Sequence, residues 1–219
     1  MRAVPGGGLF GELDEESRRA AWMRMRRRKF KKGEVIFHEG DPGDALHLIV
    51  KGHVTLKVSS PRGDRVMLRV LGPDEMLGEF AIVAPAARAA TVTALDAVET
   101  MVLDREGFEQ LRKEQPRVDE FMLSAAIEEV RRLSASLLEA LYLPVDARVC
   151  RRLCELGELF RNGDRIVVPI GQDDLAQLAG VTRQTVNRVL QKAQADDVLR
   201  VDRGRLEILD LDGLSRRAR

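Results

Sequence analysis

The hydrophobic period of the sequence changes near Asp104, and this change limits the folds that the chain can adopt. Before it, short apolar segments alternate with polar residues between glycine-containing turns; they cover residues 35–37, 46–50, 54–58, 66–71, 92–95 and 98–103. Short strands at this spacing predict an all-β sandwich or barrel. The stretches Asp41-Pro42-Gly43-Asp44 and Pro61-Arg62-Gly63-Asp64 have the composition of tight turns between such strands.

Residues 12–30 precede the predicted strands and are expected to form a helical entry. Their basic run, Arg26-Arg27-Arg28-Lys29, is interpreted as the solvated face of that helix. Binding of nucleic acid by this run is the alternative.

After Asp104 the apolar spacing becomes helical, and one long helix is predicted over residues 115–143. Its apolar positions alternate near three and four residues apart: Met122, Ala126, Val130, Leu133, Leu137 and Leu141. Such a stripe resembles a coiled-coil seam and predicts contact with a second copy of the chain. The alternative is that part of the stripe lies on the helix's own barrel. Pro144 ends the segment.

The sequence after Pro144 predicts a second, mixed domain. We expect a helix from residue 145 to 160, a strand near 166–169, two short helices, and a final hairpin of residues 198–201 and 206–209 around Arg203-Gly204. Together with the strand-rich first part, this order predicts an α+β chain of two compact units, which suits a length of 219 residues.

Composition and charge exclude several classes of protein. Apolar residues make up 44% of the chain and no apolar run approaches the roughly 20 residues of a membrane span. Residues 1–11 lack the features of a secretory signal, so the cytoplasm is expected. The net charge of +1 argues neither for nor against nucleic acid. Cys150 and Cys154 have no zinc-type spacing to other ligands, so we predict buried apolar residues and no metal site; a redox pair is the alternative.

Residues 172–194 contain the pattern of two helices crossed over a short turn. Ala176 allows the helices to approach, Gly180 permits the turn conformation, and Val186 supplies an apolar contact between them. Thr182 stands where the second helix begins and is predicted to cap it. This spacing predicts a helix-turn-helix.

The outer face of the second helix is rich in hydrogen-bond donors. It presents Arg183, Gln184, Asn187, Arg188 and Gln191, and no acid occurs from Val181 to Ala195. Arginine suits the two acceptors of guanine in the major groove, and glutamine suits adenine. Thr182 and Thr185 suit phosphate contacts. These residues therefore predict a DNA-reading helix.

A second polar stretch lies within the predicted strands. Gly78 is followed by a short segment whose backbone amides could hold an anion, and Arg88, ten residues later, could return to pair with phosphate oxygens. Glu79 could accept a hydrogen bond from a sugar hydroxyl. An ordinary ion pair between Glu79 and Arg88 is the alternative.

These features together resemble the cyclic-AMP receptor protein, or catabolite activator, family of bacterial regulators over nearly the whole chain. The resemblance implies an N-terminal cyclic-nucleotide-binding β-roll (residues 1–114), a dimerisation helix and hinge (115–144) and a C-terminal winged helix-turn-helix (145–219). It implies that the amides near Gly78 and Phe80 and the Arg88 side chain hold the cyclic phosphate, with Glu79 on the ribose.

The resemblance also bears on the identity of the effector. The stretch from Arg88 to Val92 is similar to the cassette of cyclic-AMP-dependent protein kinase regulatory subunits, in which alanine after the arginine goes with cyclic AMP. Ala89 therefore implies cyclic AMP as the candidate effector, with no cofactor required. Where well-known members offer a Thr-Ser pair to the adenine, this chain has Leu133-Ser134, so Ser134 is the expected contact.

One departure concerns the DNA-reading helix. Residues 182–188 are similar to the family's Ser-Arg-Glu-Thr-Val-Gly-Arg, but Gln184 replaces the usual glutamate. An amide suits adenine, whereas a carboxylate accepts from cytosine. We therefore expect an altered half-site.

The expected function is a homodimeric transcription regulator that binds a near-palindromic DNA operator, with no enzymatic activity and no membrane partner. A contact of residues 160–165 with RNA polymerase is a further expectation. Two alternatives remain: the same DNA-binding role without a ligand or with another effector such as cyclic di-GMP, and a nucleotide-binding module that acts on a partner protein. The last gives Arg183, Gln184 and Arg188 no role.

Overall fold

The computed structural model describes residues 13–60, 63, 65–163 and 165–218. The expectations for residues 1–11, for most of the turn at 61–64 and for position 164 of the 160–165 loop lie outside these ranges. The chain divides into two compact units; the first takes in the chain up to Val58 and residues 70–132, and the second residues 59–69 and 133 onward. Each is considered separately below.

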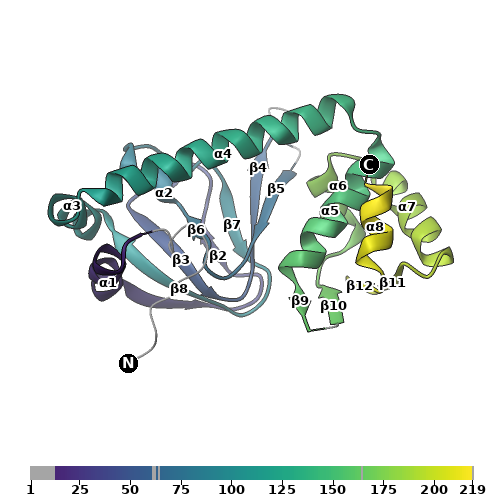
Figure 1. Cartoon of the computed structure of the whole chain (residues 1–219), viewed down its shortest axis with the longest axis horizontal. Coiled ribbons are helices and arrows are strands. Elements are labelled where there is room, and N and C mark those ends of the chain that lie inside the picture. Colours follow the sequence, from purple (N-terminus) through teal and green to yellow (C-terminus); the bar gives the residue numbers. More distant parts are fainter. Residues whose placement is uncertain (1–12, 61–62, 64, 164, 219) are drawn as a thin grey trace. The chain divides into compact units, whose positions relative to one another are not determined.

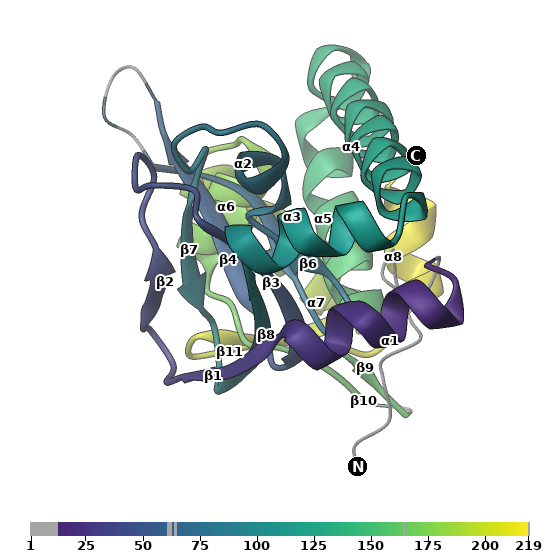
Figure 2. The same ribbon diagram turned by 90° about the vertical axis from the view of Figure 1, so that its left-hand side faces the viewer.

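The first unit is a strand-rich domain with helices at both ends of its sequence (Figures 1 and 2). Its strands form two four-stranded sheets in the orders β1-β8-β3-β6 and β2-β7-β4-β5. This arrangement confirms the predicted fold class, and all six predicted strands are present. The elements are α1 (Glu15–Arg24), β1 (Arg26–Phe30), β2 (Val35–Phe37), β3 (Ala45–Lys51), β4 (Val54–Ser59), β5 (Arg65–Leu71), β6 (Met76–Leu77), α2 (Glu79–Val83), β7 (Thr91–Ala94), β8 (Val98–Asp104), α3 (Arg105–Glu114) and α4 (Arg117–Tyr142). Residues 65–69 of β5 and residues 133–142 of α4 are counted with the second unit.

The core of this unit lies on both faces of β3, because successive side chains of a strand point in opposite directions. Leu48 packs in a cluster with α1, α3 and the first turns of α4, whereas Ile49 packs between the two sheets. Both side chains are fully buried. Figure 2 shows α1 and α3 side by side, and both helices contribute side chains to the first of these clusters.

The prediction of a helix through residue 30 was wrong for residues 26–30. Helix α1 ends at Arg24, and the basic run forms β1, which pairs antiparallel with β8. The Arg27 guanidinium forms an ion pair with Glu99 of β8, and Lys29 Nζ lies 3.6 Å from the same carboxylate. Opposite charges across paired strands, together with burial of Phe30, favour a strand where local composition indicated a helix.

Helix α4 confirms the predicted long helix, but the exposed stripe differs from the predicted seam. Met122 is buried with Val118, Phe121 and Ala125 in the core of the first unit. The predicted alternative, a helix that partly lies on its own domain, is therefore correct for the start of α4. The exposed apolar side chains along the helix are Leu123, Ile127, Val130, Leu133, Leu137, Leu138 and Leu141.

The second unit is a helical domain with a small antiparallel sheet. Its elements are α5 (Val145–Leu159), β9 (Arg161–Asn162), β10 (Arg165–Val168), α6 (Gln172–Ala179), α7 (Arg183–Ala195), β11 (Leu199–Asp202), β12 (Arg205–Ile208) and α8 (Leu211–Arg217). The strands follow the order β11-β12-β10-β9. The predicted helices, strand and hairpin are confirmed, whereas α8 was not predicted. Asp210 caps α8 by accepting from Gly213 N, and Leu214 anchors it in the core.

The two cysteines lie on α5 with free thiols, Cys150 buried and Cys154 half-buried. Burial raises the pKa of the Cys154 thiol to about 11. Because the thiolate is the reactive form, this favours the predicted role as small apolar residues over the redox alternative. Among the described residues, no group of three or more side chains could hold a metal ion, and no helix is long and apolar enough to cross a membrane.

His47 is a buried polar residue of β3 in the first unit. Its Nδ1 lies 3.2 Å from Thr100 Oγ1, and the rings of Phe30 and Phe37 flank it. Burial, with the nearby cations Arg88 and Arg28, lowers the pKa of His47 to about 3. The imidazole therefore stays neutral in the folded protein.

We predict that this histidine makes folding less stable in mild acid. As pH falls below about 6.5, the unfolded chain protonates His47 and the folded chain does not, so the free energy of unfolding decreases by up to about 1.4 kcal/mol per pH unit. Urea unfolding at pH 7.5 and pH 5 should show a smaller decrease for His47→Gln than for the wild type. His38→Gln, at an exposed position, is the control. Equal decreases for all three proteins would contradict the prediction.

Candidate nucleic-acid interface and effector site

The turn between α6 and α7 is formed by Gly180. Its φ of +62° is in the left-handed region, which a residue with a Cβ rarely adopts. An added Cβ would meet only Arg148 Nη1, at 3.7 Å, so conformation rather than space requires glycine here. Val181 N donates to Ala176 O at 3.0 Å and closes the end of α6. The predicted helix-turn-helix geometry is thus present.

Helix α7 is capped as predicted and buries one stripe of side chains. Thr182 Oγ1 accepts a hydrogen bond from Thr185 N at 3.2 Å. Helices α5, α6 and α7 pack on one another. The buried residues of α7 are Val186, Val189, Leu190 and Ala193. Their spacing of three and four residues commits one side of α7 to the interior.

The predicted DNA-contacting residues lie together on the remaining surface of α7. The side chains of Thr182, Arg183, Gln184 and Arg188 are exposed, and Thr185 and Asn187 are partly exposed. Asn187 Nδ2 donates to Gln172 Oε1 of α6 at 3.4 Å. The exposed side of α7 therefore carries several hydrogen-bond donors close together. The major groove of DNA is wide enough to admit a single helix of this kind.

Each of the two arginines on this surface contacts a carboxylate of another helix. Arg183 Nη1 lies 3.2 Å from Asp173 Oδ2 in the first turn of α6. Arg188 Nη2 lies 2.5 Å from Asp146 Oδ1 in the first turn of α5. The sequence did not predict these pairs, because Asp146 is 42 residues from its partner.

The hairpin after α7 adds exposed cations to the second unit. Strands β11 and β12 pair from Leu199 to Ile208, and Gly204 makes the reversal with a φ of +74°. Arg203 is exposed at the tip, whereas Arg205 forms an ion pair with Asp202 at 2.9 Å. The sequence predicted the hairpin but assigned no role to Arg203. The sequence feature that could have drawn attention to Arg203 is its position directly before the turn glycine, which places its side chain at the tip of the hairpin.

In the first unit, Arg88 returns to Gly78 as predicted. Arg88 Nη1 donates to Gly78 O at 3.2 Å. Gly78 has a φ of +79° and directly precedes α2, and a Cβ there would lie 2.1 Å from Arg88 Nη1. Both the conformation and the space at position 78 therefore require glycine.

The Arg88 guanidinium is buried with part of its hydrogen-bonding capacity unused. It is 4% exposed, its Cζ lies 4.2 Å from the centre of the Phe37 ring, and its Nη2 is 3.5 Å from Asp44 Oδ1. The buried Nε has no hydrogen-bond partner among the described residues. Burial lowers the pKa of Arg88, against the opposing effect of Asp44, Glu79 and Asp41. An anion beside this group would supply the acceptors that it lacks.

Arg105 fixes the position of α2 beside Arg88. Its guanidinium donates to Ile82 O at 3.0 Å and to Ala81 O at 2.8 Å, and it also bonds Gly43 O. A cation on the last carbonyls of a helix compensates their negative end. Arg105 thus joins α2 to the predicted turn at residues 41–44. The sequence gave no sign of this role, because the contacts are all to backbone carbonyls.

Unlike Arg88, the other predicted effector residues are partly or fully exposed. Glu79 is the first residue of α2 and is partly exposed, and Phe80 and Ala89 are exposed. Ser134 is exposed on α4, in the part of the helix that belongs to the second unit. Their contacts with an effector remain predictions.

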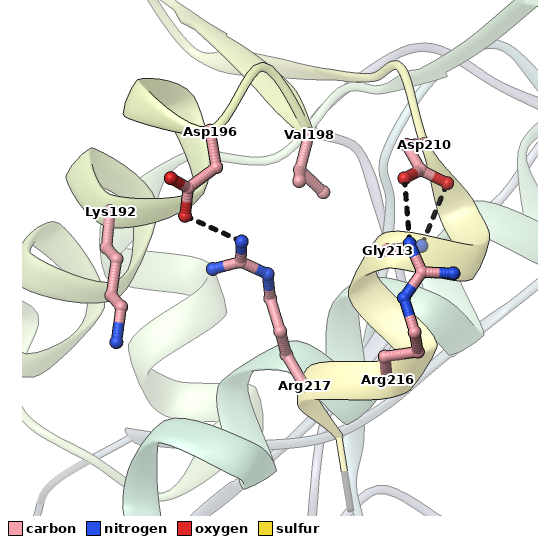
Figure 3. A pocket seen from close by; sticks show the side chains of 7 residues that line it. All are labelled: Lys192, Asp196, Val198, Asp210, Gly213, Arg216 and Arg217. Carbon is pink, nitrogen blue, oxygen red and sulfur yellow. Dashed lines mark hydrogen bonds and ion pairs between the residues drawn. The ribbon is translucent and has the colours of Figure 1, made fainter.

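A polar groove in the second unit lies between the end of α7 and α8 (Figure 3). Arg217 reaches from α8 to Asp196 at 2.6 Å, and Arg216 lies 3.4 Å from Asp210. These contacts already compensate the charges of both arginines. The groove is open, and we assign it no ligand.

Comparison with known proteins covers both units. Residues 27–115 match the family described as Cyclic nucleotide-binding domain, and residues 147–217 match the Crp-like helix-turn-helix domain. A protein of Thermus thermophilus named Cyclic AMP receptor protein is 33% identical over 94% of each chain. A Mycobacterium tuberculosis protein, named a CRP-like cAMP-activated global transcriptional regulator, is 28% identical over 97% of this chain and 96% of that one.

Solved structures agree with these matches. The crystal structure of the Thermus thermophilus catabolite activator protein aligns with a TM-score of 0.56 at 29% identity, over 96% of this chain and 97% of that chain. The c-di-GMP responsive global regulator CLP of Xanthomonas campestris aligns with a TM-score of 0.73 over 89% and 99% of the two chains. Its 21% identity supports the fold alone.

Proposed function

Because the chain belongs to the cyclic-AMP receptor protein family of bacterial transcription regulators, we propose that it is a homodimer that reads a near-palindromic operator and responds to cyclic AMP. It is a DNA-binding transcription regulator rather than an enzyme. We propose that it acts in the bacterial cytoplasm, where the chromosome lies. The three proposed parts are the effector domain at 1–114, the dimerisation helix and hinge at 115–144, and the DNA-binding domain at 145–219.

The exposed face of α7 carries the proposal for DNA. Arg183, Gln184 and Arg188 are exposed on one side of a capped helix whose other side is buried. In the proposed complex the two arginines pair with guanine acceptors and Gln184 reads an adenine. Thr182, Thr185 and Asn187 contact phosphates and fix the position of the helix. A module that acts only on a partner protein would leave this face without a role.

The buried guanidinium of Arg88 carries the proposal for an anionic effector. In the proposed complex Arg88 holds the cyclic phosphate, the amides near Gly78 and Phe80 add donors, and Glu79 accepts from the ribose. Ala89 favours cyclic AMP, as do the names of two relatives. Ser134 is the proposed contact for the base.

The exposed apolar side of α4 supports the proposed dimer. Leu123, Ile127, Val130, Leu137 and Leu141 alternate four and three residues apart, with Ser134 in register between Val130 and Leu137. This is the spacing of a two-stranded helical seam. In the dimer the two α7 helices reach half-sites about 34 Å apart. Effector binding favours that spacing with a coupling of about 1 to 3 kcal/mol. The loop at 160–165 is a proposed contact for RNA polymerase.

The effector proposal predicts the outcome of calorimetry with cyclic nucleotides. Wild-type protein should bind cyclic AMP, and Arg88→Ala should weaken binding about 100-fold or more, because two charge-assisted hydrogen bonds are lost. Arg26→Ala, which removes an arginine of β1 whose side chain is 84% exposed, is the control. Unchanged affinity of Arg88→Ala would refute the cassette assignment. Binding of cyclic di-GMP in place of cyclic AMP would refute the proposal that cyclic AMP is the effector.

The operator proposal predicts the result of selecting binding sites from random duplexes. The wild type should select a near-palindrome, and Gln184→Glu should change the preferred base at one position of each half-site, toward cytosine as the contacted base. Gln191→Glu makes the same charge change about two turns further along α7 and should leave that position unchanged. Identical preferences for wild type and Gln184→Glu would contradict the assignment.

The dimer proposal predicts the effect of a charge in the apolar stripe of α4. Sedimentation should show a wild-type dimer and a largely monomeric Leu137→Glu, because the carboxylate would be buried without a partner. Met23→Glu, at a side chain of α1 that is 77% exposed, is the control and should remain dimeric. A monomeric wild type at micromolar concentration would refute the proposal.

A further inference from the structure

We propose that Asp146 and Asp173 are specificity-determining residues, which hold the two base-reading arginines of α7 when no matching DNA is bound. This inference rests on the proposed role of α7 in DNA reading. It assigns to α5 and α6 a function besides supporting that helix. The two carboxylates weaken binding to non-matching DNA more than binding to the operator.

The geometry pairs each arginine with one carboxylate from a different helix. Arg188 Nη2 lies 2.5 Å from Asp146 Oδ1, and Arg183 Nη1 lies 3.2 Å from Asp173 Oδ2. Helix α7 contains no acid of its own. The only two arginines within α7 are therefore both matched by acids from the helices that pack against it.

Exposure makes both pairs easy to exchange. The side chains of Arg188 and Asp146 are 65% and 52% exposed, and those of Arg183 and Asp173 are 67% and 66% exposed. An ion pair at such exposure changes an equilibrium by no more than about fivefold. A bidentate contact with the correct base discriminates by about fivefold to 150-fold. A matching guanine therefore displaces the carboxylate.

Non-matching DNA lacks the base contacts that would replace the ion pairs of the two arginines. It binds through its phosphates, and its affinity depends on the positive charge that the protein presents. Asp146 and Asp173 cancel part of that charge while they hold the arginines. They also add negative charge close to the surface that would approach the phosphates. Both effects lower the affinity for non-matching DNA, and the base contacts of the operator compensate for them.

Both acids also lie in first turns, where a negative charge favours the positive end of the helix dipole. That role would affect stability alone. It gives no reason for a change in the ratio of operator affinity to non-specific affinity. This ratio is therefore the quantity that separates the two roles.

The test compares the full-length chain and Asp146→Asn by fluorescence anisotropy, with the selected operator duplex and with a shuffled duplex of equal length. Asp146→Asn should raise affinity for the shuffled duplex about 1.5-fold to 5-fold for each pair lost, with a smaller change for the operator. Glu158→Gln is the matched control, because it removes one carboxylate that lies 3.2 Å from Arg161. It lies on the same helix, about 18 Å further along, and should leave both affinities unchanged.

A second pair of variants tests whether the effect acts through the arginine. In an Arg188→Ala background, Asp146→Asn should increase non-specific binding less than it does with Arg188 present, because only the direct repulsion between the carboxylate and the phosphates is then removed. Asp173→Asn provides an independent test with Arg183 and serves also if Asp146→Asn does not fold.

Two outcomes would overturn this inference and leave the proposed function intact. In the first, the wild type prefers its operator and both aspartate variants behave as Glu158→Gln does. In the second, the variants bind the operator more weakly, which would make the carboxylates positioning residues for the arginines. A wild type that binds neither duplex would refute the proposed function itself.

Discussion

Burial of one stripe of α7 decides which of its residues remain available to a partner. Val186, Val189, Leu190 and Ala193 are committed to the interior by contacts with α5 and α6. Their spacing turns the intervening polar residues outward along the whole helix. The turn at Gly180 and the cap at Thr182 fix where this pattern begins. The proposed DNA-reading surface is thus a consequence of apolar packing on its opposite side.

The first unit uses the same principle to place a cation. Apolar residues on β3 and α2 fill the core, and Arg105 holds the short α2 by donating to two of its backbone carbonyls and to that of Gly43. Against this support the chain buries Arg88 beside Gly78, with its Nε still unpaired. A buried and incompletely paired guanidinium is costly, so an anion bound beside it would stabilise the proposed effector-bound form. The proposed regulation depends on the difference in stability between the forms with and without that anion.

Local patterns predicted most of the fold, because strands of period two and helices of period 3.6 leave clear traces in the sequence. They failed where contacts between distant segments decide the structure. The basic run at residues 26–29 forms a strand that pairs with β8, a segment far away in the sequence, and its cations lie beside Glu99 of that strand. Helix α8 was missed because its signal is short, with the cap at Asp210 and one buried leucine.

The candidate sites show the same division. The return of Arg88 to Gly78 and the exposure of Arg183, Gln184 and Arg188 followed from spacing. The contacts of Asp146, Asp173 and Arg105 did not, since their partners lie on other elements.

The most direct measurement of the central claim is the affinity for the selected operator between 50 and 200 mM salt. Binding through 6 to 10 phosphates predicts a fall of about 10³-fold to 10⁵-fold, and a flat response would contradict a DNA-binding role for this chain.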